Sequence, residues 1–89
     1  MTCLDLNDAG FAKVDVRKFE NLEVLLLKGN ALTSLDDTGI SSLSSTLKVL
    51  DLRDNKLPKM EEIVSLVRML PKLTTIGIGN NKCTDSKNW

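Results

Sequence analysis

The chain has 89 residues, which allows a single domain with a small core. Twelve Lys and Arg residues balance twelve Asp and Glu residues, so no bulk charge attracts nucleic-acid phosphates or anionic lipid. We therefore expect neither general nucleic-acid binding nor membrane binding. The first residues show no basic region followed by an apolar run, and no stretch approaches the roughly 18 apolar residues of a membrane span, so we expect neither a signal sequence nor a membrane span. We expect a cytoplasmic protein, with nuclear and cytoskeletal or axonemal locations as alternatives.

The pattern L-x-x-L-x-L-x-x-N-x-L occurs four times, in copies that start near residues 1, 22, 47 and 73. The first copy is degenerate. Its consensus positions hold Met1, Leu4, Leu6, Ala9 and Phe11. Residues 22–32 and 47–57 fill every position, and residues 73–83 follow with conservative changes. Each L-x-L predicts a short strand with its leucines inward, and successive copies predict a stacked parallel sheet.

The segments between these copies differ. The first segment carries spaced apolar positions at Val14, Val16, Phe19 and Leu22. The second segment opens on Ser34-Leu-Asp-Asp37, which predicts one turn followed by irregular chain through its serine-rich stretch. The third segment predicts a helix over 59–70, between two prolines. Its apolar face is expected to hold Met60, Ile63, Val64, Val67 and Leu70, with Glu61, Glu62 and Ser65 opposite.

Asparagine recurs at one position of the repeat, in Asn30, Asn55 and Asn81. The chain must bend sharply after each strand, and a buried carboxamide can satisfy the backbone groups exposed by the bend. We therefore predict a structural ladder of buried asparagines. Ala9 interrupts it in the first copy, which should be the loosest.

These motifs resemble the leucine-rich-repeat family, over nearly the whole chain. The likeness is to the small intracellular class, which includes phosphatase-one regulatory subunits, the axonemal dynein light chain, tubulin-folding cofactor E and the spliceosomal A-prime protein. The resemblance implies an α/β fold: a solenoid of about four rungs forming one domain, 1–89. The parallel sheet would line its concave side, with short helices or irregular chain on the convex side. Members of this class are binders or scaffolds.

The residues available for catalysis are few. Histidine is absent, which removes the commonest general base and the usual nitrogen ligand of zinc. Cys83 occupies an inward position and should pack as a small hydrophobe, while Cys3 should face outward without an activating base. Three rungs separate the two cysteines, too far for a disulfide. We predict that the chain is not an enzyme.

No cofactor or metal is expected. Asp5, Asp8, Asp51 and Asp54 recur at equivalent positions, but an intervening rung separates the two pairs by about 10 Å, too wide for one calcium ion. The fragment Gly77-Ile-Gly79 lacks the third glycine and the following helix of a dinucleotide site. We interpret these two glycines instead as part of a strand face that does not need larger side chains.

The outward strand positions give the best candidate site. They should form three columns: Cys3, Val24, Val49, Thr75; then Asp5, Leu26, Asp51, Gly77; then Asn7, Lys28, Arg53, Gly79. An apolar cluster would thus lie beside charged side chains, an arrangement typical of protein-binding surfaces. We predict a module that binds another protein on its concave face. The predicted contact residues are Asp5, Asn7, Val24, Leu26, Lys28, Val49, Asp51 and Arg53.

A structural role is the alternative. The last rung would expose Leu73, Ile76 and Ile78 with unpaired strand backbone, which invites end-to-end self-association or inclusion in a larger cytoskeletal, axonemal or ribonucleoprotein assembly. Trp89 is expected close to that edge, where it could form a minimal cap.

Overall fold

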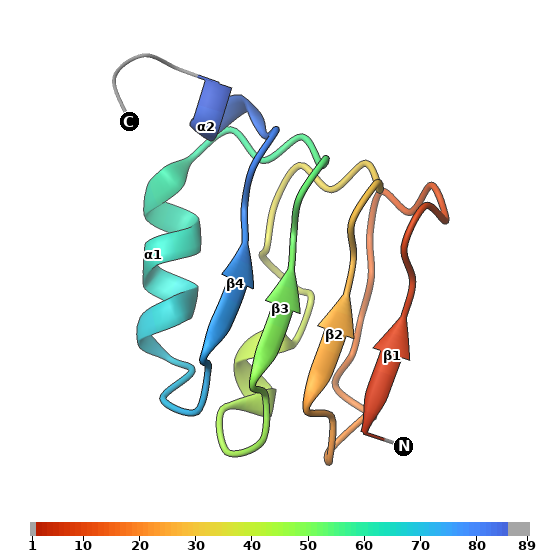
Figure 1. Cartoon of the computed structure of the whole chain (residues 1–89), viewed down its shortest axis with the longest axis vertical. Helices are drawn as coiled ribbons and strands as arrows, with labels where there is room; N and C mark the ends of the chain where they lie inside the picture. The colour runs from red at the N-terminus through yellow and green to blue at the C-terminus, as the bar shows by residue number, and fades with distance from the viewer. Residues whose placement is uncertain (1, 86–89) are drawn as a thin grey trace.

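The computed structural model describes residues 2–85 of the chain. Its four strands are β1 (Cys3–Asp5), β2 (Val24–Leu26), β3 (Val49–Asp51) and β4 (Thr75–Gly77). They form one parallel sheet in the order β1-β2-β3-β4, so that each strand lies beside the next one in the chain (Figure 1). The predicted α/β class and parallel sheet are confirmed.

Each strand is followed by a bend at an equivalent residue with a left-handed backbone. The φ angles are 55° at Asp8, 74° at Gly29, 57° at Asp54 and 57° at Asn80. Asp, Asn and Gly tolerate this conformation better than other residues do. At Gly29 a Cβ atom would lie 1.9 Å from Asp8 Oδ1, so a larger residue would also clash with the neighbouring bend. The recurrence of these residue types therefore fixes where each strand turns away from the sheet.

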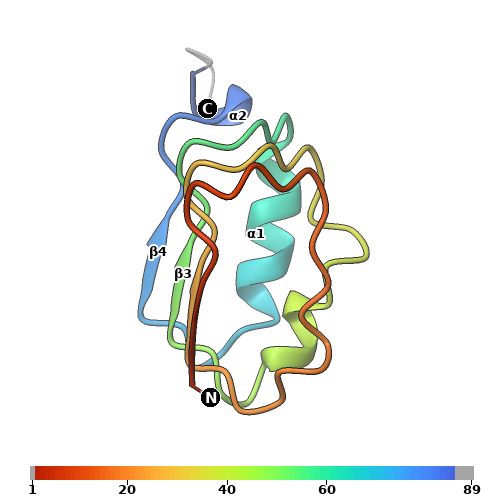
Figure 2. The same cartoon turned by 90° about the vertical axis from the view of Figure 1, so that its right-hand side faces the viewer.

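The segments that return from one strand to the next cover a single face of the sheet. They include the 3₁₀ helix η1 (Ile40–Leu43) and the helix α1 (Met60–Arg68), whereas α2 (Lys82–Asp85) follows the bend after β4. Figure 2 shows α1 and the other return segments behind one face, with none in front of the other. None of the helices in residues 2–85 is long and apolar enough to cross a membrane.

The helix predicted over 59–70 is confirmed as α1, but its predicted faces need correction. Val64 was expected in the core and is 42% exposed, whereas Leu66 is buried beside Ile63. Glu62 was expected on the solvent side and instead accepts a hydrogen bond from the Ser34 hydroxyl in the preceding return segment. Relative to the predicted orientation, α1 is therefore rotated about its axis, so that Glu62 and Leu66 both face the second return segment.

The second return segment turns at its predicted place. There the Ser34 hydroxyl accepts a hydrogen bond from the Asp36 backbone N–H, and the Thr38 N–H donates to the Leu35 carbonyl, at 3.4 Å. The stretch after this turn was predicted to be irregular and instead contains η1, which follows Gly39, whose φ is 76°. A Cβ at Gly39 would lie 2.3 Å from Arg17 Cγ, so glycine also permits close contact with the first return segment.

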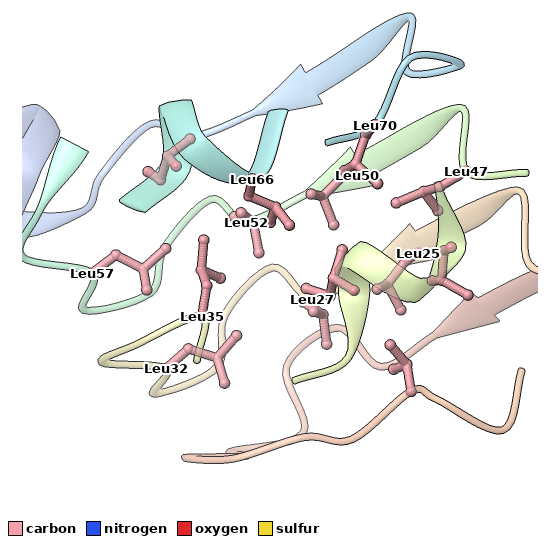
Figure 3. Close-up of a cluster of buried hydrophobic side chains, with 14 of the residues drawn as sticks. Leu25, Leu27, Leu32, Leu35, Leu47, Leu50, Leu52, Leu57, Leu66 and Leu70 are labelled. Carbon is pink, nitrogen blue, oxygen red and sulfur yellow. The ribbon is translucent and has the colours of Figure 1, made fainter. Parts of the chain in front are cut away.

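The core lies between the sheet and the return segments. The consensus positions of the two middle copies are fully buried: Leu22, Leu25, Leu27, Leu32, Leu47, Leu50, Leu52 and Leu57. Figure 3 shows many of these side chains gathered in one cluster. The equivalent end positions are only partly buried: Leu4, Leu6, Leu73, Ile76 and Ile78. A side chain needs a neighbouring unit on both sides to be enclosed, so the two ends of the sheet carry the loosest packing.

The asparagine ladder is confirmed. The Asn55 Nδ2 group donates to the Leu52 carbonyl, at 3.1 Å, and to the Leu27 carbonyl of the preceding unit, at 2.8 Å. Its Oδ1 atom accepts from the backbone N–H of Leu32, at 3.1 Å. Asn30 and Asn81 repeat this arrangement. Each carboxamide thus fastens its own bend to the one before it.

This directionality explains why Ala9 is tolerated. The asparagine of each copy bonds the bend of the copy before it, so the bend of the first copy is bonded by Asn30. The Asn30 side chain donates to the Leu6 carbonyl and accepts from the Phe11 N–H. The first copy therefore needs no asparagine of its own to join the second.

Replacing Asn55 with alanine should destabilise the fold by about 3 kcal/mol or more, because two carbonyls and one N–H lose a partner in the interior. Urea unfolding followed by circular dichroism would measure this. Asn21→Ala is the matched control, since Asn21 is exposed, and should shift the midpoint little. Similar midpoints for the two variants would contradict the role assigned to the ladder.

Candidate functional site

The sheet face opposite the return segments presents the outward strand side chains in the predicted columns. Val24 pairs with Cys3 and Val49, and Val49 with Thr75. Leu26 pairs with Asp5 and Asp51, and Asp51 with Gly77. We call this surface the open sheet face; its residues are Cys3, Asp5, Asn7, Val24, Leu26, Lys28, Val49, Asp51, Arg53, Thr75, Gly77 and Gly79. The predicted register is confirmed at every strand pair.

An apolar cluster occupies the middle of the open sheet face. Val24, Leu26 and Val49 are each partly exposed, whereas the alternate residues Leu25 and Leu50 point into the core and are fully buried. Neighbouring strands lie about 4.8 Å apart, so Val24 and Val49 are in side-chain contact range. The cluster can therefore receive an apolar side chain from outside.

Asp51 and Arg53 form a two-point ion pair on this face. Arg53 donates from Nε to Asp51 Oδ1, at 2.9 Å, and from Nη2 to Asp51 Oδ2, at 2.7 Å. The hydrogen bond from Arg53 lowers the pKa of Asp51 despite the opposing effect of burial, and Lys28 lowers it further. The same contact raises the pKa of Arg53. The pair holds the guanidinium group in a fixed place beside the apolar cluster.

Glycine on β4 makes room for this ion pair. A Cβ built at Gly77 would lie 2.9 Å from Asp51 Oδ1 and 3.0 Å from Arg53 Cγ. A larger residue would therefore require the Asp51 and Arg53 side chains to shift. This contact agrees with the prediction that the Gly77-Ile-Gly79 fragment reflects a strand face without bulk.

Three of the predicted site residues also bond backbone N–H groups at the strand ends. Asp5 Oδ1 accepts the backbone N–H of Asn7, at 3.0 Å, as Asp51 Oδ1 accepts that of Arg53. Leu26 occupies the equivalent position on β2, and its side chain has no hydrogen-bond acceptor. The Asn7 side chain replaces it by accepting the Lys28 N–H across the strands, at 2.8 Å. The sequence analysis missed these roles, although the spacing of Asp two residues before a polar residue at a strand end signals them.

The charged side chains of the face differ in their partners. In the part of the chain that the structure describes, the Lys28 amine forms no ion pair, and Lys28 as a residue is half-buried on the open sheet face. At the opposite ends of the strands, Lys48 and Glu23 pair at 2.9 Å. Lys28 is therefore the cation of this face that is available to a carboxylate from outside.

Sequence reasoning placed both cysteines correctly. Cys3 is an exposed free thiol on the open sheet face, so it is not bonded to Cys83, which is buried at an inward position. Within residues 2–85, no group of three or more Cys, Asp or Glu side chains is placed to hold a metal ion. Asp54, one of the four recurring aspartates, accepts a hydrogen bond from the Asn80 side chain at 2.6 Å. Trp89 lies outside the described residues.

Comparison with known proteins gives two relatives named for the same repeat. The chain is 36% identical, over 66 residues, to an "Acidic leucine-rich nuclear phosphoprotein 32-related protein" of Plasmodium falciparum. It is 38% identical, over 68 residues, to the mouse "Leucine-rich repeat-containing protein 43". These matches include 74% and 76% of this chain but only 22% and 9% of the relatives. Neither name describes an enzyme. No family model matches the chain, and no solved structure does.

The lowered pKa of Asp51 makes part of the stability depend on pH. A group whose pKa is depressed by folding stabilises the protein above its unfolded pKa, about 3.9 for Asp, and loses that effect as the pH falls through the folded value. Asp51→Asn should therefore be less stable than the original chain at pH 7, and this difference should narrow below about pH 4. Urea midpoints at pH 7 and pH 3 measure it. Asp36→Asn, at an exposed site, is the control; an Asp51→Asn deficit that stays constant with pH would contradict the assignment.

Proposed function

The chain belongs to the leucine-rich repeat family, and from this premise we propose that it is a non-catalytic module that binds another protein on its open sheet face. The four strands and their return segments then form a solenoid of four rungs, one domain spanning 1–89, with the open sheet face on the concave side. The common register of the strands and the repeated asparagine contacts support this description.

The proposal rests mainly on the presence of an apolar residue, Leu26, at an outward position of the open sheet face. The equivalent positions on β1 and β3 hold Asp5 and Asp51, whose side chains close the strand ends. Leu26 makes no such bond. The Asn7 side chain, next to β1, accepts the Lys28 backbone N–H in its place. The backbone therefore gives no reason for a leucine here, whereas a partner surface does, because burying an exposed apolar side chain is favourable and a few residues near the centre of an interface carry most of its binding energy.

The charged groups beside the cluster give the proposed site its orientation. Arg53 is held in place by Asp51, and the Lys28 amine lies on the same edge of the cluster. A partner would place an apolar side chain over Val24, Leu26 and Val49 and a carboxylate near Lys28. We place this interaction in the cytoplasm, with nuclear and cytoskeletal or axonemal locations as alternatives.

A second function is association through the ends of the sheet, within a larger assembly. At one end of the sheet Leu4 and Leu6 are only partly buried, and at the other end Ile76 and Ile78 are only partly buried. This incomplete burial favours association through the ends. The asparagine ladder opposes direct stacking of identical copies. If a second copy of the chain followed β4, its Ala9 would occupy the position from which an asparagine side chain should donate to the Ile78 carbonyl. A mass that stays monomeric across dilution would remove self-association from this alternative.

Leu26→Glu should weaken binding to a partner isolated by co-purification roughly tenfold or more, because it places a charge in the centre of the interface. Isothermal titration measures the change in Kd. The matched control is Val64→Glu, which alters an exposed apolar residue on α1, away from the open sheet face. Circular dichroism of both variants confirms that each one folds.

Cys3 supplies an independent readout on the original chain. Its exposed thiol lies beside Val24 on the open sheet face, so a bound partner should slow its modification by a maleimide. Unchanged labelling of Cys3 at saturating partner, or equal losses of affinity from Leu26→Glu and Val64→Glu, would place the interface elsewhere.

A further inference from the structure

The Glu62 carboxylate of α1 binds the second return segment at Ser34. The Ser34 hydroxyl donates to Glu62 Oε1, at 2.8 Å, and the Leu35 backbone N–H donates to the same oxygen. Ser34 Oγ in turn accepts the backbone N–H of Asp36, at 3.0 Å. A single hydroxyl group thus lies between a helix and the loop that precedes it in the chain.

The residues after Ser34 are acidic and exposed. Leu35 is anchored in the core, whereas Asp36 and Asp37 lie on the surface, and the Asp37 side chain is 99% exposed. They stand two and three residues after the hydroxyl. Charge patterns of this kind determine which serines a kinase accepts, because basic groups of the kinase bind the downstream carboxylates.

We propose that Ser34 is a phosphorylation site for an acidophilic serine/threonine kinase, and that its modification releases segment 33–38 from α1. In the reaction, Ser34 Oγ attacks the γ-phosphorus of ATP and ADP leaves. The hydroxyl proton goes to the general base of the kinase. This inference concerns the face opposite the proposed partner site and does not depend on that site.

The chemistry of the contact explains the release. Once esterified, Ser34 Oγ has no hydrogen to donate to Glu62. The phosphate carries close to two negative charges at neutral pH, and Glu62 and Asp36 lie close to it. Ser34 is half-buried, so the kinase must act on the conformation in which the Ser34–Glu62 bond is open. Phosphorylation then holds the loop in that conformation, because the closed one has become repulsive.

The other hydroxyl groups nearby provide internal comparisons. Ser41, Ser42, Ser44 and Ser45 have no acidic residue within the three positions that follow them. Thr33 has Asp36 three residues downstream but no acidic residue two residues downstream. The proposal therefore predicts a single preferred acceptor in this part of the chain.

The first test is the incubation of the full chain with ATP and a purified acidophilic kinase, followed by peptide mapping by mass spectrometry. One phosphate is expected, on Ser34. Most of the incorporation should be lost when Asp36 and Asp37 are both changed to Asn, which leaves the Ser34 hydroxyl in place. Absence of phosphate from Ser34, or a preference for Thr33, would overturn the proposal.

The second test concerns the release. Phosphorylation should lower the melting temperature by several degrees, and by less than half as much in Glu62→Gln, whose amide can accept from Leu35 and donate to the phosphate. Amide hydrogen exchange at Leu35 in the phosphorylated original chain should accelerate, a readout that needs no variant. An equal loss of melting temperature in both proteins, or unchanged exchange at Leu35, would contradict the release.

Discussion

The buried asparagine side chain is the interaction on which the rest of this structure depends. Each strand has only three residues, and backbone bonds such as the one from the Leu27 N–H to the Asp51 carbonyl extend the pairing beyond them. Asn30, Asn55 and Asn81 add side-chain bonds in the interior, because each one bonds the bend of its own unit and the bend before it. These bonds lie in the interior, where an unpaired carbonyl or N–H is costly. The strands are therefore held in one register.

This register determines what the open sheet face can do. Because all four strands are aligned, side chains at one position of the repeat come together in a row across the sheet. A difference at one position then has a local effect. Leucine at position 26 creates an apolar centre, and glycine at position 77 gives the Asp51 and Arg53 pair the space to lie against β4. Small departures from the repeat, on a constant backbone, shape the surface.

The return segments are less constrained by the pattern, and sequence reasoning was less accurate there. The helix at Met60–Arg68 was predictable from its flanking prolines and spaced apolar residues. Its rotation was not, because Val64 and Leu66 are both apolar and either could face the core. The Glu62 side chain settles the choice by binding Ser34 and Leu35. Gly39, which precedes η1, likewise lies close to Arg17 of another segment, a contact between units that local patterns do not predict.

The sequence by itself determined the repeat, the strands and their register, and the inward or outward position of most strand residues, because these follow from spacing within a short stretch of chain. It also determined the structural role of the asparagines, since each bend must satisfy its own backbone. Only the tertiary structure decided which side chains meet across units. Asn7 replaces the acceptor that Leu26 lacks, and Glu62 reaches Ser34, 28 residues away. Such contacts depend on the rotation and spacing of neighbouring segments, which local patterns do not encode.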